Sequence, residues 1–170
     1  MDKKTIASFV LFLALGLSVW IINRDKFLAQ EISIEQAKSV EFTFEDKSLK
    51  FNNGKYEDLA NLTTATFFEE NGGLQLAEID EKPGKDAIVV YSVSTGGSGV
   101  FIVINVVSLA EDVPKVIAHK LLGDRIIIHN ILVENKIISI DATVHGPDDA
   151  FCCPTLRKTI NLKLENGILY

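Results

Sequence analysis

The residues with the greatest capacity for chemistry lie close together near the C-terminal end of the chain. They are Asp141, His145, Asp148, Asp149, Cys152 and Cys153. Imidazole and thiolate groups are ligands that zinc and copper prefer, and a thiolate beside a base can act as a nucleophile. Adjacent cysteines rarely bind one ion together, and the spacing matches no standard metal site. The candidate metal ligands in this segment are His145, Asp149, Cys152 and Cys153.

A disulfide is the competing interpretation of Cys152 and Cys153. They are the only two cysteines of the chain, and in an oxidising compartment such a pair is expected to be oxidised. A bond between neighbours closes a tight ring, stiffens the loop 145–154 and is reduced more easily than an ordinary structural bridge. We predict this structural bond. Intermolecular pairing, redox chemistry and metal binding are the alternatives.

A second acidic group precedes an apolar strand pattern. Glu78, Asp80, Glu81 and Asp86 offer the hard oxygen ligands that calcium prefers. Their spacing does not fit the calcium-loop pattern D-x-[DN]-x-[DN]-G. The segment therefore predicts a solvated turn, with Glu78, Asp80 and Asp86 as the candidate ligands if a metal binds there.

The glycine-rich segment 95–99 predicts a hairpin connection rather than a site. It lacks the lysine of a phosphate-binding loop, and a strand pattern follows where a helix would be needed. Ser98 is no nucleophile elbow, because Val100 stands where the pattern G-x-S-x-G requires glycine. Asp124 and Arg125 predict a local ion pair that stabilises a turn.

The other two histidines, His119 and His129, have no partner at a recognisable spacing, and their neighbours predict that they pack in the interior. No set of residues combines a nucleophile, a base and an orienting group. We therefore assign no catalytic residue and no cofactor.

The elements that carry these residues have the patterns of strands. Near-continuous runs of valine and isoleucine at 87–93 and 100–107 predict strands buried on both faces. In a second hairpin Ile138, Ile140, Ala142 and Val144 share one face, and the polar residues between them share the solvent face. The remaining strand patterns span 40–44, 49–51, 63–69, 74–80, 115–122, 125–133, 136–145, 156–164 and 168–170. The predicted fold is mainly β, an antiparallel sheet or sandwich-like single domain over residues 40–170.

The first 26 residues have a different character. Thr5–Asn23 carries no charge and as a helix would measure about 28 Å, close to the thickness of bilayer hydrocarbon. No small-x-small cleavage site follows, since cleavage after Ala29 would place Phe27 at the minus-three position. We expect residues 1–26 to be a signal anchor, with a cleaved signal peptide as the alternative. Residues 27–39 form a linker or short helix, in which Ser33 is the predicted N-cap and Gln36 its capping-box partner.

Charge sets a limit on the partners. The segment 1–26 has a net charge of +2, and the rest of the chain has 13 basic and 21 acidic residues, a net charge of −8. An acidic domain repels phosphate backbones, which argues against nucleic acid as a partner. The expected partners are the membrane, through Thr5–Asn23, and a protein of the cell envelope.

Several of these segments occur in an order that resembles a known family. They are the acidic loop and strand 79–90, the turn Gly96-Gly97-Ser98-Gly99, the turn Gly123-Asp124-Arg125 and the segment Cys152-Cys153-Pro154. This order resembles an uncharacterised bacterial module found in secreted proteins and lipoproteins. The resemblance implies an extracytoplasmic location and no known activity. Some members have an acidic loop richer in aspartate that looks like a calcium loop, whereas here Lys82 and Pro83 occupy its middle.

Together these patterns favour an extracytoplasmic β-rich module with a binding or structural role, anchored in the membrane with the domain outside the cytoplasm, or secreted or periplasmic if cleaved. The alternative is an envelope redox or metal-dependent enzyme centred on the loop of His145, Cys152 and Cys153.

Overall fold

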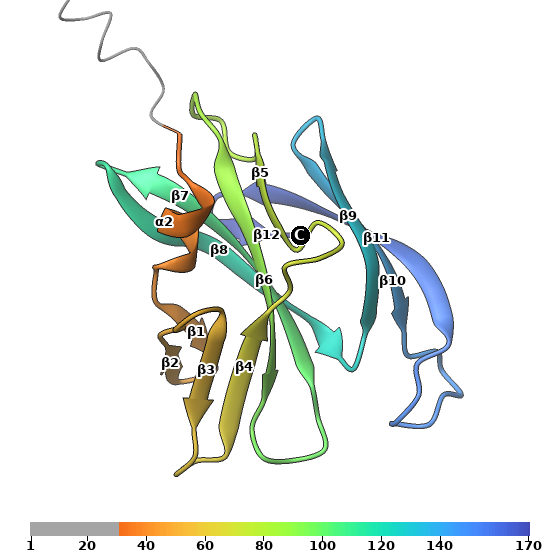
Figure 1. The fold of residues 1–170 in the computed structure, drawn as a ribbon. Coiled ribbons are helices and arrows are strands. Elements are labelled where there is room, and N and C mark those ends of the chain that lie inside the picture. Colours follow the sequence, from red (N-terminus) through yellow and green to blue (C-terminus); the bar gives the residue numbers. More distant parts are fainter. Residues whose placement is uncertain (1–30) are drawn as a thin grey trace, which may run out of the picture. The chain divides into compact units, whose positions relative to one another are not determined.

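The two most apolar strands of the chain pair at the centre of the larger of two sheets. A computed structural model describes residues 31–170, which form one unit (Figure 1). β6 (Asp86–Ser94) and β7 (Phe101–Ala110) are antiparallel, with Val90 opposite Ile104. Because successive side chains of a strand point to opposite faces, Val90 lies in one apolar core and Tyr91 in another. The predicted burial of this pair on both faces is confirmed.

The larger sheet has the strand order β3-β4-β6-β7-β8. Its other strands are β3 (Lys55–Asp58), β4 (Thr63–Phe67), β5 (Leu74–Ala77) and β8 (Val113–Asp124). β4 and β5 both pair with the same edge of β6, one beside each half of it. The chain leaves the sheet between Phe68 and Gly73, which both still bond to Val90 of β6, so this edge is built from two short strands instead of one long strand.

The smaller sheet covers one face of the larger sheet. Its order is β12-β11-β10-β9, made of β9 (Ile127–Glu134), β10 (Ile137–Val144), β11 (Leu156–Glu165) and β12 (Ile168–Leu169). Ile138 and Ile140 of β10 are fully buried in one core with Ile88 and Ile104 of the larger sheet. Complete burial of such side chains contributes roughly 1.5–3 kcal/mol each. The predicted inward face of β10 is confirmed.

A short helix and a small hairpin cover the opposite face of the larger sheet. They are α2 (Ile34–Lys38), β1 (Phe42–Phe44) and β2 (Lys47–Leu49). Phe42 packs edge-on against Phe67 and Tyr91, with ring centroids 5.6 and 5.8 Å apart. Tyr91 is fully buried, and its hydroxyl donates to the Thr43 carbonyl at 2.8 Å. The hairpin is therefore held to the sheet by aromatic packing and a partly buried hydrogen bond.

The β4–β5 connection and the start of β5 also bind the edge of the smaller sheet. Asn71 donates through Nδ2 to the Ile128 carbonyl, and its own carbonyl accepts from the Ile131 amide at 2.8 Å. Gln75 donates to the Ile131 carbonyl at 3.0 Å. These bonds occupy backbone groups of β9 that an edge strand would otherwise expose, and they join the two sheets directly.

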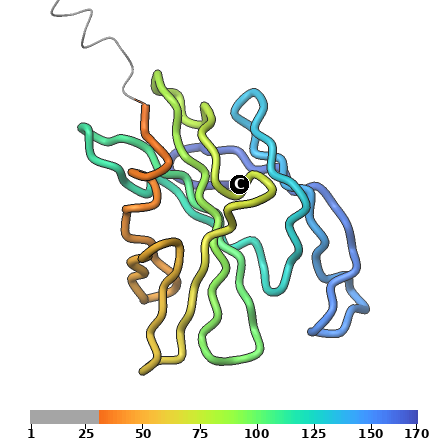
Figure 2. Tube along the Cα trace, viewed as in Figure 1, coloured from red at the N-terminus to blue at the C-terminus, as the bar shows by residue number. Residues whose placement is uncertain are grey.

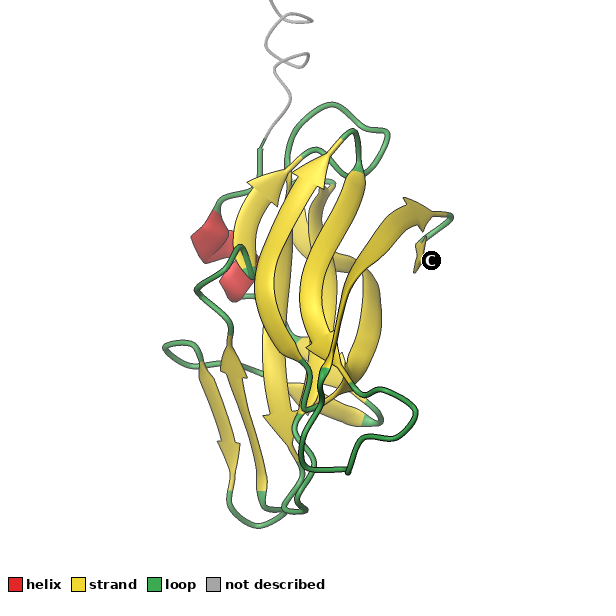
Figure 3. Ribbon diagram, turned by 90° about the vertical axis from the view of Figure 1, so that its right-hand side faces the viewer, coloured by secondary structure: helices red, strands yellow, loops and turns green. Residues whose placement is uncertain are grey.

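The described residues are mainly strand, in antiparallel sheets, as the sequence predicts (Figure 3). Ser33 caps α2 with Gln36 in a capping box, which confirms that prediction. Within residues 31–170 no helix is long and apolar enough to cross a membrane. The predicted anchor Thr5–Asn23 lies outside the described residues.

Some local predictions are wrong. Strand β3 is not predicted from the sequence, because the charged residues Lys55, Glu57 and Asp58 hide the pattern of an edge strand. His119 and His129 are exposed rather than packed. His119 points outward from the edge strand β8, and His129 lies where the pairing of β9 with β10 shifts register.

Replacing Tyr91 with phenylalanine should lower the free energy of unfolding by about 1 kcal/mol at pH 8, because the Thr43 carbonyl loses its buried donor. Burial also raises the pKa of the Tyr91 phenol above its usual value. The stabilisation is therefore fully present below about pH 10 and lost as the pH rises further, since the unfolded phenol ionises first. Urea unfolding of the full-length protein from pH 8 to pH 11 should show a smaller alkaline loss for Tyr91→Phe than for wild type. The control is the exposed Tyr170→Phe, and equal alkaline losses in all three proteins would refute the assignment.

Candidate functional site

Connections between strands gather at one end of the sheets. We call this surface the loop end and define it as residues 58–62, 95–100, 124–126 and 145–155 (Figure 2). Gly96 has a φ of +84° and lies against Leu62, so that a Cβ atom built on it would lie 2.7 Å from the Leu62 Cβ. A side chain there would be strained and would also clash. This close approach joins the β3–β4 turn to the β6–β7 loop.

Arg125 connects three of these segments through its guanidinium group. Nε and Nη2 donate to the Ser98 carbonyl at 3.0 and 2.5 Å, and Nη2 also donates to the Ser98 hydroxyl at 3.0 Å. Nη1 donates to Asp124 at 2.7 Å and to the Phe151 carbonyl at 2.5 Å. A guanidinium carries five N–H donors, so every donor is used within the protein. Arg125 therefore has no donor left for an anionic ligand and serves to hold the loops together.

The second carboxylate oxygen of Asp124 also binds the β6–β7 loop. Its Oδ1 accepts from the Val100 amide at 2.8 Å, and the Arg125 amide donates to the Val100 carbonyl at 2.6 Å. The ion pair between Asp124 and Arg125 that the sequence predicts is present. It stabilises the point where the chain leaves β8 for β9, and it does so with Arg125 at a φ of +51°.

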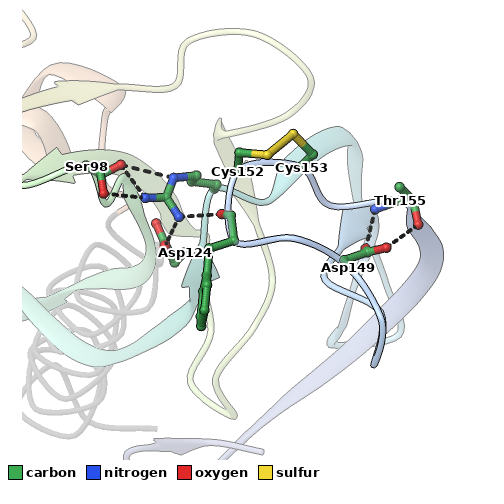
Figure 4. The surroundings of a disulfide bond; sticks show 8 residues. Ser98, Asp124, Asp149, Cys152, Cys153 and Thr155 are labelled. Atoms are coloured by element: carbon green, nitrogen blue, oxygen red, sulfur yellow. Dashed lines mark hydrogen bonds and ion pairs between the residues drawn. A yellow bond between two sulfur atoms is a disulfide. The ribbon is translucent and has the colours of Figure 1, made fainter.

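Asp149 ties the two ends of the β10–β11 loop to each other. It accepts a hydrogen bond from the Gly146 amide at 2.8 Å. It also accepts from the amide and the hydroxyl of Thr155, both at 2.7 Å (Figure 4). The bond from Gly146, followed by those from Thr155, holds the pKa of Asp149 below its usual value. The carboxylate is thus engaged as a loop clamp and has little capacity left for a metal or a substrate.

The tip of this loop is exposed although its ends are fixed. Cys152 and Cys153 are joined by a disulfide, and both residues are exposed. The preceding Phe151 has 89% of its surface exposed, the largest value among the exposed apolar residues of the described chain. In this oxidised state neither cysteine offers a thiolate to a metal or to a substrate.

The other candidate ligands do not form a metal site. His145 is half-buried, and within residues 31–170 no hydrogen-bond partner reaches its Nε2. Asp86 is buried and accepts from the amides of Ile79 and Asp80 at 3.2 and 2.9 Å, so it stabilises the acidic turn, while Glu78 is exposed. In the part of the chain that the structure describes, no three His, Cys, Asp or Glu side chains are placed to hold one ion.

A polar cluster on the outer face of the smaller sheet was not predicted. His129 Nε2 lies 2.8 Å from the Thr143 hydroxyl, and Asp141 receives two bonds from Arg157 at 3.1 and 2.6 Å. Hydrogen bonding from Arg157 lowers the pKa of Asp141. Alternation along β10 could have placed Asp141 beside Thr143, but the register shift that brings in His129 has no sequence signal. Because Arg157 occupies the carboxylate, the cluster does not form a hydroxyl–imidazole–carboxylate relay.

Comparisons with protein-family models, with curated proteins and with solved structures found no match to this chain. The geometry of the loop end is therefore the basis of the functional argument.

Replacing Arg125 with alanine should lower the free energy of unfolding by about 2–3 kcal/mol, because Asp124 and two carbonyls lose a largely buried charged donor. Lysine at position 125 should restore only part of the lost free energy of unfolding, since an ammonium group cannot reproduce the planar arrangement of N–H donors of the guanidinium. Urea unfolding of the full-length protein measures both variants. The matched control is Arg157→Ala, which breaks an exposed pair and should lower the free energy of unfolding much less than Arg125→Ala. Equal losses for Arg125→Ala and Arg157→Ala would contradict the role of Arg125.

Acid should release the β10–β11 loop before it unfolds the domain. Because the pKa of Asp149 is lowered in the folded state, its clamp is fully formed above about pH 4 and is lost as the pH falls through the lowered value. The amide proton shifts of Gly146 and Thr155, followed by NMR from pH 7 to pH 2, should report this transition together. Asp149→Asn should abolish it. Amide shifts with a midpoint above pH 4, or an unchanged transition in the variant, would contradict the assignment.

Proposed function

We propose that this protein is a non-enzymatic binding module of the cell envelope, and that Thr5–Asn23 anchors it with the β-rich domain outside the cytoplasm. The proposed binding surface is the loop end. The proposal depends on one observation: the Phe151 carbonyl is held by Arg125, while the residue has 89% of its surface exposed. An aromatic side chain on a fixed backbone is a typical anchor of a protein interface.

Fixing the backbone before binding lowers the entropic cost of association. The loop that carries Phe151 is held by Asp149 at its two ends and by Arg125 near its tip. The Cys152–Cys153 bond removes further freedom directly after the aromatic residue. The apolar side chain can therefore enter a pocket without first having to be ordered.

The charge of the loop end indicates the kind of partner. Its acidic residues are Asp58, Asp124, Asp148 and Asp149, and its only Lys or Arg is Arg125, whose donors are all used. The surface is therefore apolar at its tip and net negative around it. The partner that fits is an envelope protein with an apolar pocket and a rim of lysine or arginine residues, since complementary charge raises the association rate and the specificity.

Asp149 and the two cysteines of the loop end support a non-enzymatic role, because these groups are already engaged within the protein. Asp149 holds three hydrogen bonds, and the cysteines are bonded to each other. The second candidate function is an envelope redox enzyme centred on Cys152 and Cys153, which the exposure of that disulfide favours. Catalytic turnover of a dithiol and a disulfide substrate by the purified protein would support the enzyme and contradict the binding module.

A photo-crosslinking amino acid at position 151 should test the binding surface in native membranes. We expect one dominant adduct with a protein, which wild-type protein in excess competes away and which Arg125→Ala reduces. With the purified partner, Phe151→Ser should weaken binding about tenfold or more and leave the unfolding midpoint unchanged, because the side chain is exposed.

The matched control for crosslinking is position 159, where Thr159 is exposed on the outer face of the smaller sheet. Adducts of the same pattern from positions 151 and 159, or none from position 151, would refute the loop end as the binding surface.

A further inference from the structure

We infer that the Cys152–Cys153 disulfide is a redox modification site, reduced by a protein dithiol, and that its state controls the presentation of Phe151. The modification site rests on the disulfide alone, whereas the control of binding through Phe151 rests on the proposed function. The bond lies at the exposed tip of the loop end, directly after Phe151 (Figure 4).

The position of the two cysteines in the sequence shows that the bond does not serve global stability. A disulfide stabilises a fold mainly by closing a loop of the unfolded chain, and the effect grows with the length of that loop. Cys152 and Cys153 are neighbours and close the shortest loop possible. The effect of the bond is therefore local to the tip.

The contacts that fix the loop do not involve sulfur. Asp149 binds Gly146 and Thr155, and Arg125 binds the Phe151 carbonyl, through nitrogen and oxygen atoms only. These bonds are compatible with both redox states, so reduction leaves the loop attached at both ends. What reduction frees is the backbone between Phe151 and Pro154, where the ring of the disulfide and the bond from the Cys153 amide to the Ala150 carbonyl restrict the chain.

The reaction is a thiol–disulfide exchange in which two electrons and two protons pass to the domain. A thiolate of the reductant attacks one cysteine sulfur, the S–S bond breaks, and the other cysteine leaves as a thiolate that takes up a proton. The second thiol of the reductant then attacks its own mixed disulfide, forms the reductant's internal disulfide and releases the first cysteine, which is protonated in turn.

A dithiol is the class of reductant that this geometry requires. After attack by a monothiol, the freed neighbouring cysteine is held beside the mixed disulfide and displaces the monothiol again. A dithiol escapes this reversal because its second thiol resolves the mixed disulfide first.

Reduction of the full-length protein in detergent tests the site, with dithiothreitol as the probe. We expect both cysteines to become reactive to maleimide without denaturant, as an added mass shows, with a change in the unfolding midpoint of no more than about 5 °C. Amide exchange should increase at Cys153, whose amide is bonded to the Ala150 carbonyl, and stay unchanged at Gly146, whose amide is bonded to Asp149. 2-Mercaptoethanol at the same thiol concentration should reduce less of the protein. A need for urea to reach the bond, or unfolding on reduction, would overturn the inference.

A double variant, Cys152→Ser with Cys153→Ser, supplies a permanently open tip. It should reproduce the exchange pattern of the reduced protein and bind the partner about three- to tenfold more weakly than the oxidised protein, because the freed tip must be ordered on binding. If Phe151→Ser loses binding while the double variant binds like wild type, control by the disulfide is refuted and the binding module stands. If no binding depends on Phe151, the binding module is refuted, and the reduction and exchange experiments still decide the modification site.

Discussion

The burial of β6 and β7 on both faces is the constraint from which the rest of the domain follows. Most side chains of this hairpin are apolar, and they point to both faces, so neither face can be left to water. The smaller sheet covers one face, and α2 with the β1–β2 hairpin covers the other. Because the central hairpin is covered on both sides, its connecting loop emerges at one end, where the neighbouring connections meet it.

At the loop end, hydrogen bonds join the rigid central hairpin to the exposed loops. Ser98 in the central hairpin loop accepts three bonds from Arg125, which also holds the carbonyl of Phe151. The exposure of an ion pair and the number of its hydrogen bonds determine whether it can hold loops together. The Arg125 side chain is 19% exposed and fully bonded, whereas the Arg157 side chain is 66% exposed and pairs with Asp141 on an open sheet face. The first pair organises loops, and the second contributes little to stability.

Much of the architecture could be predicted because patterns among residues close together in the sequence identify its elements. The continuous apolar runs of β6 and β7, the alternation of β10 and the capping box at Ser33 each identify an element from neighbouring residues. The candidate site could be predicted only in part. Adjacent cysteines indicate their own bond, and Asp124 beside Arg125 indicates an ion pair. The other two partners of Arg125, Phe151 and Ser98, lie 26 and 27 positions away and depend on how the strands pair. The register shift that places His129 beside Thr143 is likewise a property of the assembled sheet.

The central claim is that the exposed tip of the loop end is rigid before any partner binds. Backbone order parameters from ¹⁵N relaxation of the oxidised full-length protein test it directly. The account predicts values near 0.85 at the amides of Phe151 and Cys152, about equal to those of β6 and β7. Values below about 0.6 at these amides, with β6 and β7 still rigid, would show a mobile tip and contradict it.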